Sequence, residues 1–164
     1  MLRPRASVAL RAATPDDGAW VVARHGAIYA AEFGWDASFA ALVAEVMQSY
    51  AAGHDPTCEA GWVAEVDGRR AGSVFCIRQD RRTAKLRVLF LEPWARGRGI
   101  GSRLVAECIS FARDAGYDEL VLWTVDVLAG ARRIYERAGF RLTRSEPAHR
   151  FGSRLVDEYW SLTL

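Results

Sequence analysis

The chain has 164 residues, of which 51% are apolar and 26% charged, and its net charge at pH 7 is +2. This length suits a single domain, and no apolar run approaches the ~20 residues of a membrane-spanning helix. The 22 basic residues are scattered and nearly balanced by 20 acidic ones, so no basic block indicates nucleic-acid binding. We expect one domain, residues 1–164, with neither a membrane nor a nucleic acid as partner.

The N-terminus and the cysteines bear on location and metal binding. The start is basic, but the apolar stretch after it is broken at Arg11, too soon for a secretory signal. We therefore expect a cytoplasmic protein. Cys58, Cys76 and Cys108 are odd in number and have no metal-ligand spacing, so we expect no zinc or other metal.

The first part of the chain predicts a strand followed by two helices. Residues 7–12 alternate apolar and polar side chains, as a strand does. Thr14 as a cap, followed by Pro15 and two acids, predicts a helix from there to about residue 29. Apolar residues at helical spacing predict a second helix over 37–51.

Three strands are predicted next. Asp-Gly at 67–68 separates the apolar segments 62–66 and 71–77, a pattern typical of a hairpin. Another strand is predicted over 85–91.

The remaining chain predicts two more strand and helix units and a final pair of strands. After a glycine-rich turn at 96–101, a helix ends at Gly116, followed by strand 120–125, helix 128–138, and strands 140–143 and 156–164. The nearly continuous apolar run at 120–125 indicates a strand covered on both faces. The order predicts an α/β (α+β) fold with a mixed, twisted sheet of six to seven strands flanked by about four helices.

The turn between strand 85–91 and the following helix has the composition of a phosphate site. Amide hydrogens at a helix start lack intrahelical partners, and the helix dipole adds positive charge there. Gly97, Gly99 and Gly101 let phosphate oxygens approach the backbone, and Arg96 and Arg98 add charge. A flexible surface loop is the alternative interpretation.

Two other phosphate motifs fit this turn less well. The dinucleotide fingerprint requires glycine or alanine where this chain has Ser102 or Leu104. A P-loop requires a lysine after its last glycine, and the chain's one lysine, Lys85, lies upstream.

Two motifs carry a family resemblance. Arg96-x-x-Gly99-x-Gly101 follows a strand ending in Leu91-Glu92-Pro93, and Ala131-x-x-x-Tyr135-x-x-x-Gly139-Phe140 comes later. The first resembles the acetyl-coenzyme A signature of the GNAT superfamily of N-acetyltransferases, and the second resembles its second motif. The order of elements also matches, so the resemblance covers nearly the whole chain and implies that fold with acetyl-CoA as co-substrate.

Four shorter stretches are similar to the acetyltransferase half of bacterial proteins that fuse a MarR-type winged helix to a GNAT domain. They are residues 29–35, 84–87, 122–128 and 149–152. Few residues precede the first predicted strand, so we expect the DNA-binding half to be absent.

The resemblance also implies how the co-substrate is held. The amides of Leu89 and Leu91 would bind the pantetheine arm, and an amide near this point would stabilise the oxyanion. The expected contacts are Leu89, Leu91, Arg96, Gly97, Arg98, Gly99, Ile100, Gly101, Ser102, Leu128, Ala131 and Arg132. Leu128 departs from the family, where many members have an asparagine that contacts the cofactor.

Catalytic roles follow from the same resemblance. Tyr135 is expected to act as the general acid that protonates the departing thiolate, since its ordinary pKa of about 10 is close to that of a thiol. Glu92 is expected to draw a proton from the ammonium acceptor through water, and Glu32 is a second candidate. A solvated surface carboxylate is the alternative for both.

The acceptor is expected to be a small primary amine that attacks acetyl-CoA directly in a ternary complex. Tyr29, Glu32, Phe33 and His149 are the predicted acceptor-binding residues, with Trp35 nearby. Two alternatives remain, a module that senses acyl-CoA or a metabolite without turnover, and a protein N-acetyltransferase. Dimers are common in the superfamily, and the sequence leaves a homodimer open.

Overall fold

The computed structural model describes residues 5–164, so most of the basic start lies outside the described residues. The elements in chain order are β1 (Val8–Ala12), α1 (Asp17–Phe33), α2 (Ala37–Gly53), β2 (Ala60–Val66), β3 (Arg69–Arg78), β4 (Thr83–Leu91), the short 3-10 helix η1 (Pro93–Ala95), α3 (Ile100–Asp114), β5 (Glu119–Val125), α4 (Ala129–Ala138), β6 (Arg141–Arg150) and β7 (Ser153–Thr163). This is the predicted order, and the mixed seven-stranded sheet with four helices confirms the predicted fold.

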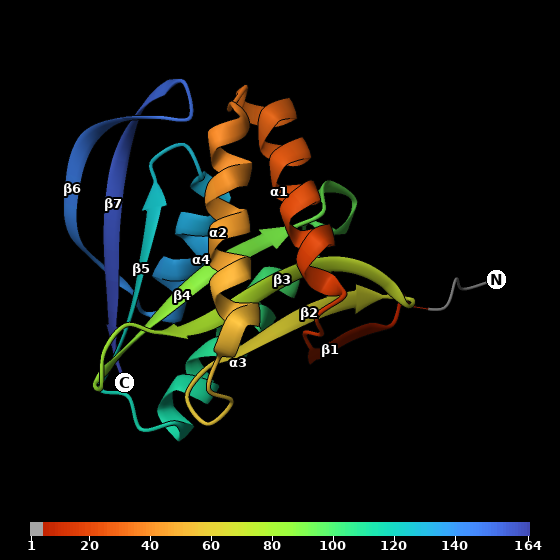
Figure 1. Ribbon diagram of the computed structural model, residues 1–164, viewed down its shortest axis with the longest axis vertical. Helices are drawn as coiled ribbons and strands as arrows, with labels where there is room; N and C mark the ends of the chain where they lie inside the picture. Colours follow the sequence, from red (N-terminus) through yellow and green to blue (C-terminus); the bar gives the residue numbers. More distant parts are fainter. Residues whose placement is uncertain (1–4) are drawn as a thin grey trace.

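The seven strands form one sheet in the order β1-β2-β3-β4-β5-β7-β6 (Figure 1). All neighbours are antiparallel except β4 and β5, which are parallel. That parallel pairing runs only from Thr83 opposite Glu119 to Lys85 opposite Val121. Beyond Lys85 the two strands diverge, as Figure 1 shows, and the sheet opens at its centre.

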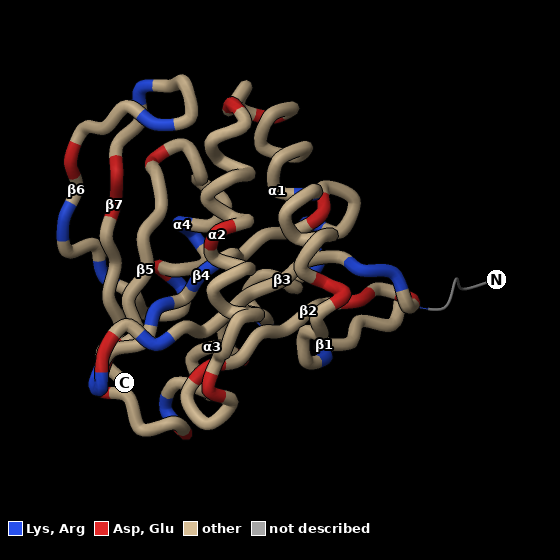
Figure 2. The backbone as a smooth tube through the Cα atoms, viewed as in Figure 1, with Lys and Arg blue, Asp and Glu red and all other residues tan. Residues whose placement is uncertain are grey.

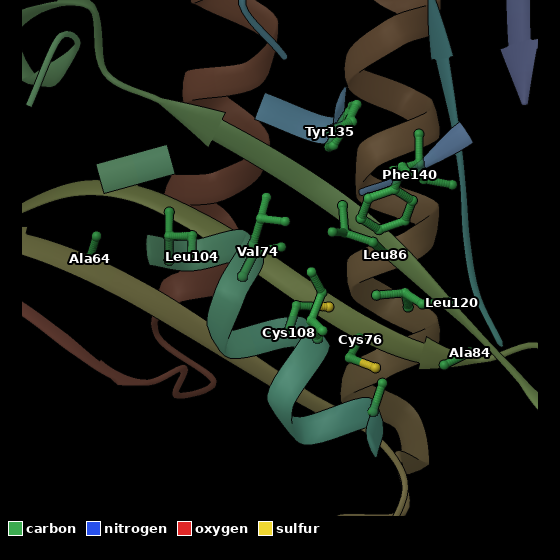
Figure 3. Close-up of a cluster of buried hydrophobic side chains, with 14 of the residues drawn as sticks. Ala64, Val74, Cys76, Ala84, Leu86, Leu104, Cys108, Leu120, Tyr135 and Phe140 are labelled. Atoms are coloured by element: carbon green, nitrogen blue, oxygen red, sulfur yellow. The ribbon is translucent and has the colours of Figure 1, made fainter. Parts of the chain in front are cut away.

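The helices cover the two faces of the sheet in pairs. Helices α1 and α2 pack on one face around Phe75 and Phe90, and α3 and α4 pack on the other. Figure 3 shows Leu104 and Cys108 of α3 facing Val74 of β3 within this second cluster. Burial of these apolar side chains on both faces is the main stabilising contribution to the fold.

The hairpin of β6 and β7 reaches back to the connection between α1 and α2 (Figure 1). Phe151 and Gly152 form its two-residue turn, with φ of 55° and 78°, as a tight hairpin turn requires. The carbonyl of Phe151 accepts a hydrogen bond from the amide of Asp36 at 3.0 Å. The ring centroids of Phe151 and Trp35 are 4.9 Å apart. The last hairpin of the chain therefore packs against the connection between α1 and α2.

Two sequence expectations need correction. Thr14 does not cap α1, because the helix begins at Asp17 and the Thr14 amide instead donates to the Asp17 carboxylate at 2.7 Å. The last two strands are longer than predicted. The sequence missed most of β6 because this edge strand is polar and contains Pro147, which an edge strand tolerates.

Charged side chains are interspersed in sign over the described chain (Figure 2). None of the helices within residues 5–164 combines the length and apolar character needed to cross a bilayer.

Candidate active site

The site lies where β4 and β5 separate, and a bulge in β4 marks the place. Pairing with β3 shifts between Arg87, opposite Phe75, and Phe90, opposite Ser73. Val88 between them has a φ of 57°, which is rare for a β-branched residue. Its carbonyl accepts a hydrogen bond from the Ser73 hydroxyl at 2.9 Å, so the distortion is held from β3.

A cavity of about 100 Å³ occupies the gap between the two strands, and we call it the inner cavity. Residues of α1 and α2 line it on one side, and residues of α4 line it on the other. It is lined by His25, Tyr29, Trp35, Phe39, Leu42, Val43, Val46, Lys85, Leu86, Arg87, Val88, Leu89, Trp123, Thr124, Val125, Leu128, Ala131 and Tyr135.

A wider groove adjoins the inner cavity, and we call it the outer groove. Its lining residues are Tyr29, Glu32, Phe33, Leu89, Phe90, Leu91, Arg96, Gly97, Gly101, Val127, Leu128, Ala129, Gly130, Ala131, Arg133 and Ile134. The two spaces share Tyr29, Leu89, Leu128 and Ala131. A long ligand in the outer groove can therefore meet a second ligand in the inner cavity.

The glycine-rich turn sits at one end of the outer groove. Gly97 and Gly99 have φ of 77° and 75°, and Gly99 is the N-cap of α3 with no side-chain cap. The first amides of α3 therefore have neither an intrahelical partner nor a capping side chain. A Cβ at Gly101 would lie 2.7 Å from Cδ1 of Ile134, so glycine keeps the groove open there.

These features fit a phosphate-bearing ligand. Uncapped helix amides and the helix dipole favour an anion at this end of the groove. Arg96 and Arg133 add two cations along its wall. At the end of β4 that leads into this turn, the Glu92 amide donates a hydrogen bond to the Ala71 carbonyl of β3 at 2.7 Å. Because amide directions alternate along a strand, the Leu91 amide points to the opposite edge, which faces the gap.

Most predicted cofactor contacts line the outer groove, but some do not. Leu89, Leu91, Arg96, Gly97, Gly101, Leu128 and Ala131 line it, whereas Arg98, Gly99, Ile100, Ser102 and Arg132 are not among its lining residues. Arg132 turns away and forms an ion pair with Glu158, with Nε 2.8 Å from Oε1. Its neighbour Arg133 is the arginine of α4 that reaches the groove.

Tyr135 projects from α4 into the inner cavity. It is 5% exposed, and its ring packs edge-on to Phe140 with centroids 5.8 Å apart. Burial raises the pKa of its hydroxyl well above the ordinary value, and the nearby hydroxyl of Tyr29 adds to the effect. Tyr135 is therefore protonated at neutral pH, and its pKa lies further above that of a thiol than the sequence-based expectation assumed.

The two predicted base candidates lie in different places, and both are ion-paired. Glu92 binds Arg24 with both carboxylate oxygens and lines a separate surface pocket next to Trp20 and Trp94, so the structure does not bring it together with Tyr135. Glu32 lines the outer groove, where its Oε1 accepts from Nη1 of Arg96 at 2.6 Å.

Three of the four predicted acceptor residues lie together. Tyr29, Glu32 and Phe33 are on the last two turns of α1 and line the outer groove. Tyr29 stacks on Trp35 with centroids 5.2 Å apart, and burial raises its pKa to about 12. His149 is apart from them, exposed on β6 and lining neither space.

Sequence reasoning missed His25. This buried side chain lines the inner cavity, and its Nδ1 lies 2.8 Å from the Val21 carbonyl, which requires Nδ1 to carry the proton and donate. Burial lowers the pKa of His25 to about 4, so the ring is neutral. Its position one helical turn before Tyr29 was the available signal.

Comparison with known proteins identifies the family. The sequence matches the Acetyltransferase (GNAT) family over residues 22–140, a span that contains the outer groove and Tyr135. The chain belongs to the GNAT acetyltransferase family. This confirms the family resemblance drawn from the two motifs.

Several relatives with sequence similarity carry the name N-acetyltransferase. A human protein, N-acetyltransferase 8B, is 36% identical over 101 residues, which are 58% of this chain and 44% of that protein. N-acetyltransferase 8F1 of Rattus norvegicus is 30% identical over 125 residues, 73% of this chain and 51% of that protein. This GNAT chain thus spans about half the length of these curated relatives.

Solved structures share the fold over nearly the whole chain. The structure of yncA from Salmonella typhimurium, solved with its cofactor acetyl-CoA, has a TM-score of 0.79 at 20% identity and covers 96% of this chain and 94% of its own. A ribosomal-protein-alanine N-acetyltransferase from Brucella melitensis has a TM-score of 0.76 at 20% identity, covering 95% and 99%. At this identity the likeness establishes the fold.

Proposed function

We propose that this GNAT chain transfers an acetyl group from acetyl-CoA to the primary amine of a small molecule, by direct attack in a ternary complex. The observation that carries the proposal is the junction of two spaces. The outer groove ends in an uncapped helix start, the inner cavity holds a buried, protonated Tyr135, and both share Leu89, Leu128 and Ala131. Two substrates can therefore be bound at once and meet at one point.

In this proposal the outer groove holds acetyl-CoA. The amides at the start of α3 bind the pyrophosphate, with Arg96 and Arg133 as cations. The Leu89 and Leu91 amides bind the pantetheine arm along the free edge of β4. The side chain of Leu128 lines both spaces, so an apolar contact takes the place of the amide contact that an asparagine would make.

Acetyl-CoA supplies the thioester that the acceptor amine attacks. The new C–N bond forms as the C–S bond breaks, and Tyr135 gives its hydroxyl proton to the departing sulfur. The aromatic and aliphatic side chains that line much of the inner cavity would limit the competition of water with the amine. Glu92 and Glu32 remain the candidates for removing the amine's proton, and Glu32 is the one that lines the groove.

Cavity size favours a small molecule over a protein as acceptor. The inner cavity holds about 100 Å³ and is walled by helices on both sides of the gap. A lysine side chain on a protein would need an open approach. Four further expectations stay predictions. They are the resemblance to the MarR fusion proteins, the single-domain organisation, the cytoplasmic location and the homodimer.

A thiol-release assay tests the proposal. The protein is incubated with acetyl-CoA and each of a panel of small primary amines, and free CoA is measured against a control without amine. Amine-dependent release supports the transferase. Tight binding of acetyl-CoA by calorimetry with no release from any amine would favour the sensing module instead.

A further inference from the structure

Two cations that line the inner cavity, Lys85 and Arg87, have no carboxylate partner among residues 5–164. Lys85 and Arg87 lie two residues apart on β4, so both point to the same face of the sheet, toward α1 and α2. Both are half-buried. Within residues 5–164, neither forms an ion pair.

The other half-buried arginines of the described chain behave differently. They are Arg11, Arg24, Arg70 and Arg132, and each lies within 3.3 Å of a carboxylate oxygen. Burying a cation without a counter-ion costs free energy, so proteins pair such groups. Arg87 is the exception, and the cation next to it, Lys85, increases the cost.

Both side chains respond to this environment. Burial lowers the pKa of Lys85, and the neighbouring Arg87 lowers it further. Burial also lowers the pKa of Arg87, with Glu45 acting in the opposite direction from beyond ion-pair distance. An anion bound between the two cations would relieve the desolvation of each.

Lys85 and Arg87 lie near the place where the inner cavity meets the outer groove. Leu89, which the inner cavity shares with the outer groove, lies two residues beyond Arg87 along β4. Two residues of regular strand span roughly 7 Å, and the bulge at Val88 makes this separation no longer than that. The aromatic rings of Tyr29, Trp35 and Phe39, which also line the cavity, suit an amine end.

We propose that Lys85 and Arg87 bind a carboxylate of the acceptor, so that the substrate is a small amino acid whose amine reaches the junction at Leu89. This inference rests on the proposed transferase function and adds the substrate class. Arg87 provides a planar fork for two carboxylate oxygens, and Lys85 provides a point charge beside it.

The experiment compares amines in matched pairs. Each pair holds an aminocarboxylate and the amine without the carboxylate: glycine with methylamine, β-alanine with ethylamine, and 4-aminobutyrate with propylamine. Thiol release with acetyl-CoA gives kcat/KM for each on the wild type, Lys85→Met, Arg87→Met and the double variant. Arg81→Met, which removes an exposed arginine from the turn before β4, is the control.

We expect the carboxylate member of at least one pair to be preferred by about tenfold to a hundredfold, the range of a charge-assisted hydrogen bond. The double variant should lose this preference while Arg81→Met keeps it. The variants should fold, because removing an unpaired half-buried cation leaves Tm unchanged or raises it.

Two outcomes separate this inference from the proposed function. Turnover of amines with no carboxylate preference, or a preference that survives in the double variant, overturns the carboxylate site and leaves the transferase standing. If no amine is turned over, calorimetry with the same aminocarboxylates decides. If the wild type binds an aminocarboxylate and the double variant does not, the anion site stands without the transferase. If the wild type binds none of them, both proposals are overturned.

Discussion

The guanidinium of Arg24 binds the carboxylate of Glu92 through two hydrogen bonds, from Nε to Oε1 at 2.6 Å and from Nη2 to Oε2 at 2.9 Å. The pair joins α1 to the end of β4, and Glu92 is 5% exposed. Both carboxylate oxygens are thus occupied by an arginine outside the two spaces that meet at Leu89.

We expect Glu92→Gln to act mainly on stability. The glutamine loses the charge and one acceptor oxygen, which should lower the free energy of unfolding by about 1–3 kcal/mol. Urea unfolding measures that loss, and thiol release measures the turnover, which should stay within about tenfold of the wild type. A drop in kcat of about a hundredfold with stability intact would instead identify Glu92 as the general base.

Tyr135→Phe should lower kcat by about a hundredfold or more, because the ring remains and only the proton donor is removed. The affinity for acetyl-CoA, measured by calorimetry, should change little. Packing against Phe140 should also persist, so thermal unfolding serves as the control. Unchanged turnover would remove Tyr135 from the mechanism.

Gly99→Glu should abolish acetyl-CoA binding, because a negative side chain would stand where the pyrophosphate binds. Its φ of 75° strains any other residue, so Gly99→Gln carries the same strain without the charge. Gly116→Glu places the same charge at a φ of 86° at the far end of α3. We expect binding by calorimetry to fall in the order Gly116→Glu, Gly99→Gln, Gly99→Glu. Equal binding by the two Gly99 variants would argue against a phosphate at this helix start.

Gly101→Ala tests the width of the groove. The new methyl would lie 2.7 Å from Cδ1 of Ile134, a side chain that lines the groove and would have to shift. We expect the KM for acetyl-CoA to rise about tenfold, corresponding to roughly 1.4 kcal/mol of overpacking. Adding Ile134→Val removes the clashing atom and should restore much of the affinity. A Gly101→Ala enzyme with wild-type KM would show that this contact does not shape the groove.

His25 predicts a pH dependence of folding. Its pKa is about 4 in the folded protein against 6.5 for the free side chain, so the unfolded chain binds more protons between these values. Stability from this group is therefore full above pH 6.5 and falls as the pH drops to 4, by up to about 3 kcal/mol at 1.36 kcal/mol per unit. Urea unfolding across this range measures the slope.

His25→Asn can still donate to the Val21 carbonyl but does not titrate, so it should flatten this slope. The pKa of Asp17 is lowered, chiefly by its hydrogen bond with Arg11. Its contribution to stability is therefore lost only below the ordinary aspartate pKa near 4, outside the pH range in which His25 titrates. A slope unchanged in His25→Asn would assign the effect to other groups.

Sequence reasoning was strongest where one local pattern decides a structure. The Asp67-Gly68 hairpin, the glycine turn before α3 and the helix end at Gly139 were predicted because φ sign and helix capping are local properties. The family motifs added the expected co-substrate contacts, most of which line the outer groove.

Long-range contacts were out of reach of the sequence. No pattern in the chain indicates that Arg24 would pair with Glu92, 68 residues away. Nor does any pattern indicate that Arg132 would pair with Glu158 while Arg133 lines the groove. With 21 arginines in the chain, each had many acidic partners available. Tertiary packing decides which of them meet.

The contacts of Phe151 with Asp36 and Trp35 have a consequence for folding during synthesis on the ribosome. The helix start that would hold the pyrophosphate is synthesised some fifty residues before the turn that completes the aromatic wall beside Trp35. The glycine-rich turn and the start of α3 are thus encoded early, while the packing of Phe151 against Trp35 waits for the last hairpin. The aromatic cluster that begins at Trp35 is therefore complete only once both ends of the polypeptide have been made.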